Sequence, residues 1–242
     1  IVASVVGSDP EGQELIDLFE KRGISTEGVI VSGKRKTTVK TRVISSKQQL
    51  LRIDSEDTSP ISSEIVKRLC SSVERIIKDG VDAIILEDYN KGVLSKHIIH
   101  LFIELAKNNN IPITADPKKE NFYEYGGITI FKPNLKELKE GLNVEFDLSK
   151  NKTDFENAVE QLRKKIPHQL SLITLSEHGI YATDENTSSY AKAHAREITD
   201  VSGAGDTVIA TATLCYICGA SVQQIAKISN IAGGMVCEKP GV

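Results

Sequence analysis

The stretch DVSGAGDTV, residues 200–208, combines residue types that could bind an anion and move a proton. Gly203 and Gly205 let backbone N–H groups turn toward a ligand, and a helix that begins near Asp206 would direct its positive dipole end there. Such amides stabilise the charge on a phosphoryl group in transfer, with Asp206 where an acceptor hydroxyl loses its proton. A structural interpretation is also open, in which Asp206 is a helix N-cap and the glycines only form a tight turn.

The segment KPNLKE presents a similar choice between a ligand site and a helix cap. Asn134 and Glu137 are three residues apart at an expected helix start, so that both side chains can point the same way. Together they could hold a hydrated Mg²⁺ near nucleotide phosphates. The same pair also forms a capping box, and the local sequence favours this cap.

Three further motifs are less informative by themselves. EDYNKG and ADPKKENF each place an aspartate at an expected strand end with a lysine close behind. Lys91 and Lys118 could face anionic oxygens, or they could be solvated loop lysines. The segment TLSEHG, residues 174–179, is a strand-to-turn junction without unambiguous chemistry of its own.

The elements that must position these residues alternate between strand and helix along most of the chain. This alternation predicts an open, mainly parallel α/β sheet covered by helices on both faces. The first residues of the chain are expected to be part of a strand, and the later expected strands are 82–89, 111–117, 128–134, 171–179, 179–184 and 189–198. The expected helices are 12–24, 61–80, 94–110, 135–142, 155–166 and a helix from Asp206 onward.

The carboxyl ends of these strands are the expected place for a ligand. In open α/β sheets, ligands bind outside the carboxyl ends of the strands. Five polar residues lie at or just past such ends: Asp88, Asp116, Asn134, Thr174 and Asp200.

Residues of about 33–56 interrupt the alternation and predict a β-flap beside the core. Its first strand would place Lys36, Thr38, Lys40 and Arg42 on one face, and Arg52 on the second strand could join them if the register allows. Several cations would suit a substrate that already bears a phosphate. The alternative is a solvated edge strand, whose lysines discourage pairing with other chains.

The composition is that of an ordinary globular chain of 242 residues, 40% hydrophobic and 26% charged. A net charge of −3 argues against a nucleic-acid partner, and no apolar stretch is long enough for a bilayer. The lone C-x-x-C of Cys215 and Cys218 favours buried small side chains in a reduced, intracellular protein. His97 and His100 share a helix face, but no acidic or thiol partner nearby completes a metal site.

Taken in order, these motifs resemble the ribokinase-like (PfkB-type) family of ATP-dependent sugar kinases. DVSGAGDT resembles the C-terminal signature of that family, NLKE its N-x-x-E motif and TLSEHG its nucleotide-side loop. The resemblance covers nearly the whole chain. It implies a single ribokinase-like domain over residues 1–242, truncated at both ends, with a three-layer sandwich, a mostly parallel central sheet and the flap as a lid.

The resemblance also implies roles for the motif residues. Asp206 would be the general base, and the amides of Ala204, Gly205 and Asp206, in the turn that begins at Gly203, would form the anion hole. ATP and Mg²⁺ would be the cofactors, with a monovalent cation as an optional addition. The implied residues for the nucleotide are Asn134 and Glu137, which also hold Mg²⁺ through water, together with Thr174, Ser176, Gly179 and Asn230.

Within the family, the segments RKTTVKTRVISSKQQLLRID, EDYNKG, DPKKENF and AHAREITDVSGAGDTVIAT most resemble kinases of D-glycero-β-D-manno-heptose 7-phosphate. This likeness implies phosphorylation at the anomeric oxygen, to the 1,7-bisphosphate used for ADP-heptose and lipopolysaccharide core synthesis. It further implies a cytoplasmic enzyme that dimerises through the flap. The implied sugar-phosphate contacts are Lys40, Arg42, Arg52, Asp88 and Lys91. A same-fold kinase for ribose, fructose phosphate or a nucleoside, and a non-catalytic nucleotide-binding relative, are the alternatives.

Overall fold

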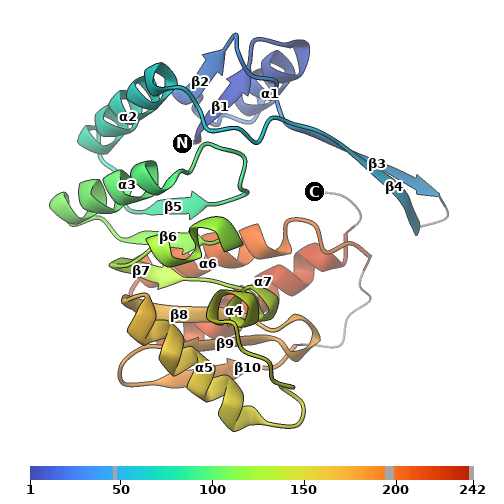
Figure 1. Ribbon diagram of the computed structural model, residues 1–242, viewed down its shortest axis with the longest axis vertical. Helices are drawn as coiled ribbons and strands as arrows, with labels where there is room; N and C mark the ends of the chain where they lie inside the picture. The colour runs from blue at the N-terminus through green and yellow to red at the C-terminus, as the bar shows by residue number, and fades with distance from the viewer. Residues whose placement is uncertain (46–47, 194–198, 240–242) are drawn as a thin grey trace. The chain divides into compact units, whose positions relative to one another are not determined.

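The computed structural model describes residues 1–45, 48–193 and 199–239 (Figure 1). The chain forms two compact units: Ile1–Val81 with Asn90–Ile98, and Asp82–Tyr89 with Ile99–Val242. We call them unit 1 and unit 2 and describe each by itself. The expectation of a single domain with an inserted flap stays a prediction.

Unit 2 contains a six-stranded sheet in the order β10-β9-β8-β7-β6-β5. Its strands are β5 (Ile84–Glu87), β6 (Ile113–Asp116), β7 (Ile128–Phe131), β8 (His168–Thr174), β9 (Ile180–Thr183) and β10 (Ser188–Ala191). The pairs from β5 to β8 are parallel, whereas β9 and β10 pair in the antiparallel sense. The short strands are rich in isoleucine and other apolar residues because both faces of the parallel part are covered.

Helices lie on both faces of this sheet (Figure 1). They are α3 (Lys96–Asn108), which begins in unit 1, α4 (Leu135–Leu142), α5 (Lys152–Lys165), α6 (Ala204–Ile217) and α7 (Val222–Cys237). Two 3₁₀ turns, η1 (Lys119–Glu124) and η2 (Ser176–His178), follow β6 and β8. Figure 1 shows α4 and α5 on one face, and α6 and α7 on the other. Val208, Ile209 and Ala226 of α6 and α7 pack on the strands in one apolar core.

Unit 1 is built on a parallel pair of strands, β1 (Ala3–Gly7) and β2 (Gly28–Ser32), joined by α1 (Pro10–Lys21). Asp9 caps α1, with its Oδ1 accepting from the N–H of Gly12. Helix α2 (Ser63–Lys78) packs against β2 with its apolar face. The β-flap extends from this unit as the antiparallel pair β3 (Val39–Ser45) and β4 (Gln48–Ser55).

The α/β class and the mainly parallel sheet are confirmed, and the described helices and strands fall where the alternation predicted them. The sequence did not predict β2 or α7. β5 is the last strand of the six-stranded sheet, and its Ile85 is 37% exposed. The connecting residues Ser46 and Lys47 of the flap, and the part of strand 189–198 after Ala193, lie outside the described residues.

Candidate active site

The parallel strands of unit 2 bring the predicted polar residues to one edge of the sheet. β5 ends at Glu87, directly before Asp88, and β6 ends at Asp116. Thr174 ends β8, and Asn134 follows β7 and forms a parallel β-bridge with Thr174. The prediction that polar residues lie at strand carboxyl ends is therefore confirmed for Asp88, Asp116, Asn134 and Thr174. For Asp200 it stays a prediction, because β10 ends at Ala191 and residues 194–198 lie outside the described residues.

Asp206 lies in the first turn of α6 and not at its N-cap. The N-cap is Gly203, whose φ of 74° lies in the left-handed region that glycine tolerates. The N–H of Ala204 donates to the carbonyl of Val201 at 3.3 Å. The amides of Gly205 and Asp206 belong to the first turn, where a helix offers its N–H groups no intrahelical acceptor. The N-cap interpretation of Asp206 is wrong, and this helix start can bind an anion.

Three carboxylates meet near this helix start. Oxygen atoms of Glu87, Asp116 and Asp206 lie within 4.8 Å of one another. Oε2 of Glu87 and Oδ1 of Asp116 are buried and accept no hydrogen bond within the described residues. Buried carboxylate oxygens that lack donors are suitable ligands for a hard divalent cation such as Mg²⁺. The described residues contain no other such group of three potential metal ligands.

A buried lysine balances part of this negative charge. Lys132 is 2% exposed, and its Nζ lies 2.9 Å from Oδ2 of Asp116. Burial raises the pKa of Asp116, and the charges of Lys132 and Lys118 oppose that effect. Burial, followed by the charges of Asp116 and Asp206, raises the pKa of Glu87 to about 7. Near neutral pH the cluster therefore carries less negative charge than three solvated carboxylates would.

The turn after β5 is fixed by Asp88 and presents Tyr89 to Asp206. Asp88 is 2% exposed, and its Oδ2 accepts hydrogen bonds from Asn121 at 2.9 Å and from Tyr125 at 2.8 Å. The Oη of Tyr89 donates to Oδ1 of Asp206 at 2.6 Å. Asp88 therefore supports the loop from within, and a direct contact of its side chain with a sugar stays a prediction.

Asn134 and Glu137 form the capping box that their spacing indicated. The Oδ1 of Asn134 accepts from the N–H of Glu137 at 2.8 Å, and Oε2 of Glu137 accepts from the N–H of Asn134 at 2.8 Å. Oε1 of Glu137 accepts from Nζ of Lys118 at 2.5 Å. Lys118 is thus an ion-pair partner and not a solvated loop lysine. A water-mediated Mg²⁺ role for this pair is compatible with the cap, because a carboxylate oxygen has further lone pairs.

The residues expected along a nucleotide gather around the turn after β8. Ser176 and Gly179 have φ angles of 52° and 99°. A β-carbon at Gly179 would lie 2.0 Å from the carbonyl oxygen of Ala191, so only glycine fits there. Nδ2 of Asn230, on α7, donates to the carbonyl of the neighbouring Lys192 at 2.9 Å. Gly179 and Asn230 therefore contact the same short segment, although 51 positions separate them in the chain.

The flap brings its cations together in unit 1, but acidic residues lie among them. Lys40 pairs in register with Asp54, and Arg42 with Arg52, so these side chains share one face. The Nζ of Lys40 lies 3.4 Å from Asp54, and Nε of Arg52 lies 3.0 Å from the same carboxylate. Arg52 thus joins the face as predicted.

A second carboxylate extends this charged face toward Lys91. Oε1 of Glu56 accepts from Nζ of Lys91 at 2.5 Å, and its Oε2 lies 3.6 Å from Lys40. Lys40, Arg42 and Arg52 do share one face, but Asp54 and Glu56 lie on it as well, because alternate residues of β4 and the segment after it face the same side. Within the described residues, Lys40, Arg52 and Lys91 each form an ion pair, whereas Arg42 forms none.

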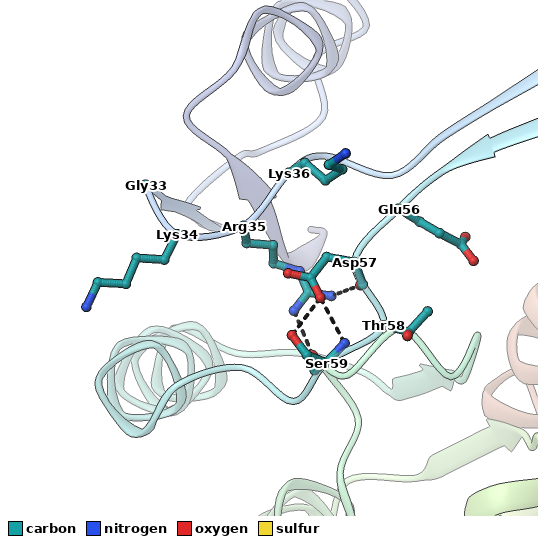
Figure 2. Close-up of a pocket in the computed structure, with 8 residues that line it drawn as sticks. All are labelled: Gly33, Lys34, Arg35, Lys36, Glu56, Asp57, Thr58 and Ser59. Carbon is teal, nitrogen blue, oxygen red and sulfur yellow. Dashed lines mark hydrogen bonds between the residues drawn. The ribbon is translucent and has the colours of Figure 1, made fainter.

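A polar cavity of about 640 Å³ lies at the base of the flap (Figure 2). It is lined by Gly33, Lys34, Arg35, Lys36, Glu56, Asp57, Thr58 and Ser59. Arg35 points toward Asp57 and Ser59 in Figure 2 and donates to the carbonyl of Ser59 at 3.0 Å and to those of Asp57 and Lys91. Arg35 therefore ties together the segments at the start and end of the flap.

Two features outside the site concern residues named in the sequence analysis. Nε2 of His100 lies 2.9 Å from Oε2 of Glu124, on the turn η1, which is an ion-pair contact and not a group of three metal ligands. Cys215 and Cys218 are free thiols, but Cys218 is exposed because it is the C-cap residue of α6 and not part of the packed helix face.

Sequence reasoning missed Glu87, Tyr89 and Lys132 as members of the site. Glu87 and Tyr89 flank the aspartate of EDYNKG, so their position at a strand end was a usable signal. Lys132, the lysine of KPN, reads as an ordinary polar residue until its burial is known.

The comparison with protein families defines the class of this protein. Residues 2–242 match the family described as pfkB family carbohydrate kinase. The chain therefore belongs to this family of carbohydrate kinases. No helix among the described residues has the length and apolar character needed to cross a membrane.

Individual curated relatives and solved structures show which members of the family this chain is similar to. The bifunctional protein HldE of Aliarcobacter butzleri (strain RM4018) is 39% identical over 240 residues, which are 99% of this chain and 49% of that protein. HldE of Helicobacter pylori (strain J99) is 35% identical over 99% of this chain and 51% of its own length. The chain thus spans about half the length of the curated relatives it matches.

Phosphofructokinase-2 from Escherichia coli in complex with potassium superposes with a TM-score of 0.81 at 18% identity, over 98% of this chain and 75% of that one. The tetrameric inhibited form of the same enzyme gives a TM-score of 0.79 at 18% identity, over 96% of this chain and 75% of that one. At these identities the structures show the ribokinase-like fold alone.

Proposed function

We propose that this chain transfers the γ-phosphoryl group of ATP to the anomeric hydroxyl of D-glycero-D-manno-heptose 7-phosphate, giving the 1,7-bisphosphate. The observation that carries a kinase mechanism is the place of Asp206 in the first turn of α6, beside the carboxyl ends of β5 and β6. The resemblance of the flap and of EDYNKG to heptose 7-phosphate kinases supports this acceptor. The product would serve ADP-heptose and lipopolysaccharide core synthesis in the cytoplasm, where ATP and sugar phosphates are available.

In this mechanism the chain's own residues move one proton and stabilise one developing charge. The carboxylate of Asp206 accepts the proton of the sugar hydroxyl. The hydroxyl oxygen forms a bond to the γ-phosphorus, while the bond from the γ-phosphorus to the β-phosphate oxygen breaks. The amides of Gly205 and Asp206 stabilise the charge on the transferred group. Mg²⁺, when bound, would neutralise phosphate charge, and Glu87, Asp116 and the pair Asn134 and Glu137 are the residues suited to hold it.

The Asp206→Asn variant of the full-length protein tests the base. Turnover should fall by roughly 10²- to 10⁴-fold, the usual contribution of general acid–base catalysis, while ATP affinity stays within a few-fold. ADP release, measured against a panel of heptose 7-phosphate, fructose 6-phosphate and ribose, identifies the acceptor. Near-normal turnover of the variant would remove Asp206 from the mechanism, and preference for another sugar would overturn the substrate.

We propose that the charged face of the flap recognises the phosphate of the sugar. Lys40, Arg52 and Lys91 are held by carboxylates, so Arg42 is the cation with the most freedom to pair with a phosphate. A charge-assisted contact contributes roughly 1.5–3 kcal/mol. Arg42→Ala should therefore raise KM for heptose 7-phosphate about ten- to hundredfold, with KM for ATP and for the unphosphorylated sugar unchanged.

Lys67→Ala, which removes an exposed charge on α2 of the same unit, is the matched control for Arg42→Ala. Equal discrimination between the two sugars in the wild type and in Arg42→Ala would leave the flap without a role in phosphate recognition. The Asp206 test is independent of this outcome, because it concerns unit 2 alone.

The opposite face of the flap supports the proposal of a homodimer. Val43, Leu51 and Ile53 alternate with the charged residues, and these three are 43%, 53% and 53% exposed. Apolar residues in a contiguous exposed patch are typical of an interface, and a second flap would cover them with like residues. Sedimentation of Ile53→Glu should give a monomer where the wild type gives a dimer, and a monomeric wild type would refute this assembly.

A further inference from the structure

We propose that Tyr89 is a positioning residue that fixes the carboxylate of Asp206 for proton transfer, an inference that rests on the proposed role of Asp206 as the base. The Oη of Tyr89 donates to Oδ1 of Asp206 at 2.6 Å, and both residues belong to unit 2. A hydroxyl that donates to a carboxylate at this distance forms a charge-assisted bond. Holding Oδ1 in this way sets the direction in which Oδ2 faces.

Tyr89 is attached to a well-bonded end of the sheet although the residue is 47% exposed. It stands two residues after the end of β5. The intervening Asp88 is bonded to Asn121 and Tyr125, and its N–H donates to the carbonyl of Asp116 at 3.1 Å. The backbone that carries the phenol is therefore held by β6 and by the turn η1.

Asp206 needs such a partner because its other neighbours repel it. Carboxylate oxygens of Glu87 and Asp116 lie within 4.8 Å of its own, and like charges at this separation favour rotation of the Asp206 side chain toward water. Tyr89 opposes that rotation as a neutral donor.

The test is a double-mutant cycle in the full-length protein with Tyr89→Phe, Asp206→Ala and the combined variant. Tyr89→Phe removes only the hydroxyl and should lower kcat roughly ten- to hundredfold, the value of a hydrogen bond to a charged group. KM for ATP and for heptose 7-phosphate, and the unfolding midpoint, should stay at wild-type values. In the Asp206→Ala background, measured with enzyme in excess of sugar, Tyr89→Phe should change the residual rate less than about twofold.

Tyr216→Phe is the matched control, because Oη of Tyr216, on the same helix α6, donates to Oε1 of Gln169 at 2.7 Å. Its kcat should equal that of the wild type. An unchanged kcat in Tyr89→Phe, or an equal loss with and without Asp206, would overturn the positioning role while the base assignment stands. Full turnover in Asp206→Ala alone would instead refute the proposed function, and the inference with it.

Discussion

Replacing Lys132 with methionine should show how much the stability of the buried carboxylate of Asp116 depends on one buried cation. The side chains of Lys132 and Asp116 are 3% and 10% exposed, and their charged atoms are 2.9 Å apart. Methionine keeps most of the length and the apolar stem of lysine but removes the charge. The substitution therefore leaves Asp116 as a buried carboxylate without its principal partner.

The expected loss can be worked out from this pair. Removing one partner of a buried ion pair costs about 3–5 kcal/mol, because the remaining charge is uncompensated. Lys118 remains 3.8 Å from Oδ1 of Asp116 and compensates part of the loss. Burial already raises the pKa of Asp116, so this residue can also take up a proton. We expect the free energy of unfolding to fall by about 2–4 kcal/mol at pH 8.

The loss should depend on pH in a direction that follows from linkage. In the variant the folded-state pKa of Asp116 rises further above the unfolded-state value of about 3.9. The folded protein then binds a proton that the unfolded chain has lost, so stability declines as pH rises through the window between the two pKa values. The destabilisation should accordingly be smaller at pH 5 than at pH 8.

Urea denaturation followed by circular dichroism at pH 5 and pH 8 measures both quantities. Lys136→Met is the control, because Lys136 is 82% exposed and its pair with Glu140 spans 3.8 Å, which predicts almost no effect. Adding Asp116→Asn to Lys132→Met should recover much of the stability at pH 8. A loss below about 1 kcal/mol at pH 8, or one equal at both pH values, would refute the view that Lys132 compensates a buried charge.

Two further predictions concern the cap and a buried histidine. Glu137→Gln keeps the capping box, so stability should barely change, whereas the Mg²⁺ concentration required for half-maximal turnover should rise; equal magnesium titrations would confine Glu137 to the cap. Burial lowers the pKa of His168 from 6.5 to about 4. Between these two pH values the unfolded chain binds a proton at this histidine that the folded protein does not bind. The free energy of unfolding should therefore fall as pH drops from 6.5 to 4, by up to about 3 kcal/mol. Unfolding of His168→Gln between pH 7 and pH 4 should lack this decline, and a decline as steep as in the wild type would contradict it.

Much of the fold and part of the site could be predicted from the sequence because they depend on local patterns. Apolar periodicity located most helices and strands of unit 2, and the alternation of helices with strands indicated a mainly parallel sheet. Because the carboxyl ends of parallel strands lie at one edge of the sheet, the sequence alone predicted that Asp116, Asn134 and Thr174 lie close together. The turn at Gly203 and the capping box of Asn134 were likewise readable from spacing.

Only the tertiary structure decided which of these groups pair with one another. The side chains of Tyr89, Lys132 and Asp206 come from segments far apart in the chain, and their hydrogen bonds depend on rotamers and burial that no local pattern encodes. The same holds for the flap. Side-chain alternation predicted that its cations share one face, but the register of β3 with β4 placed Asp54 beside Lys40. Charge compensation is a property of side chains brought within a few ångströms by folding, and for that reason it could not be read from the order of residues.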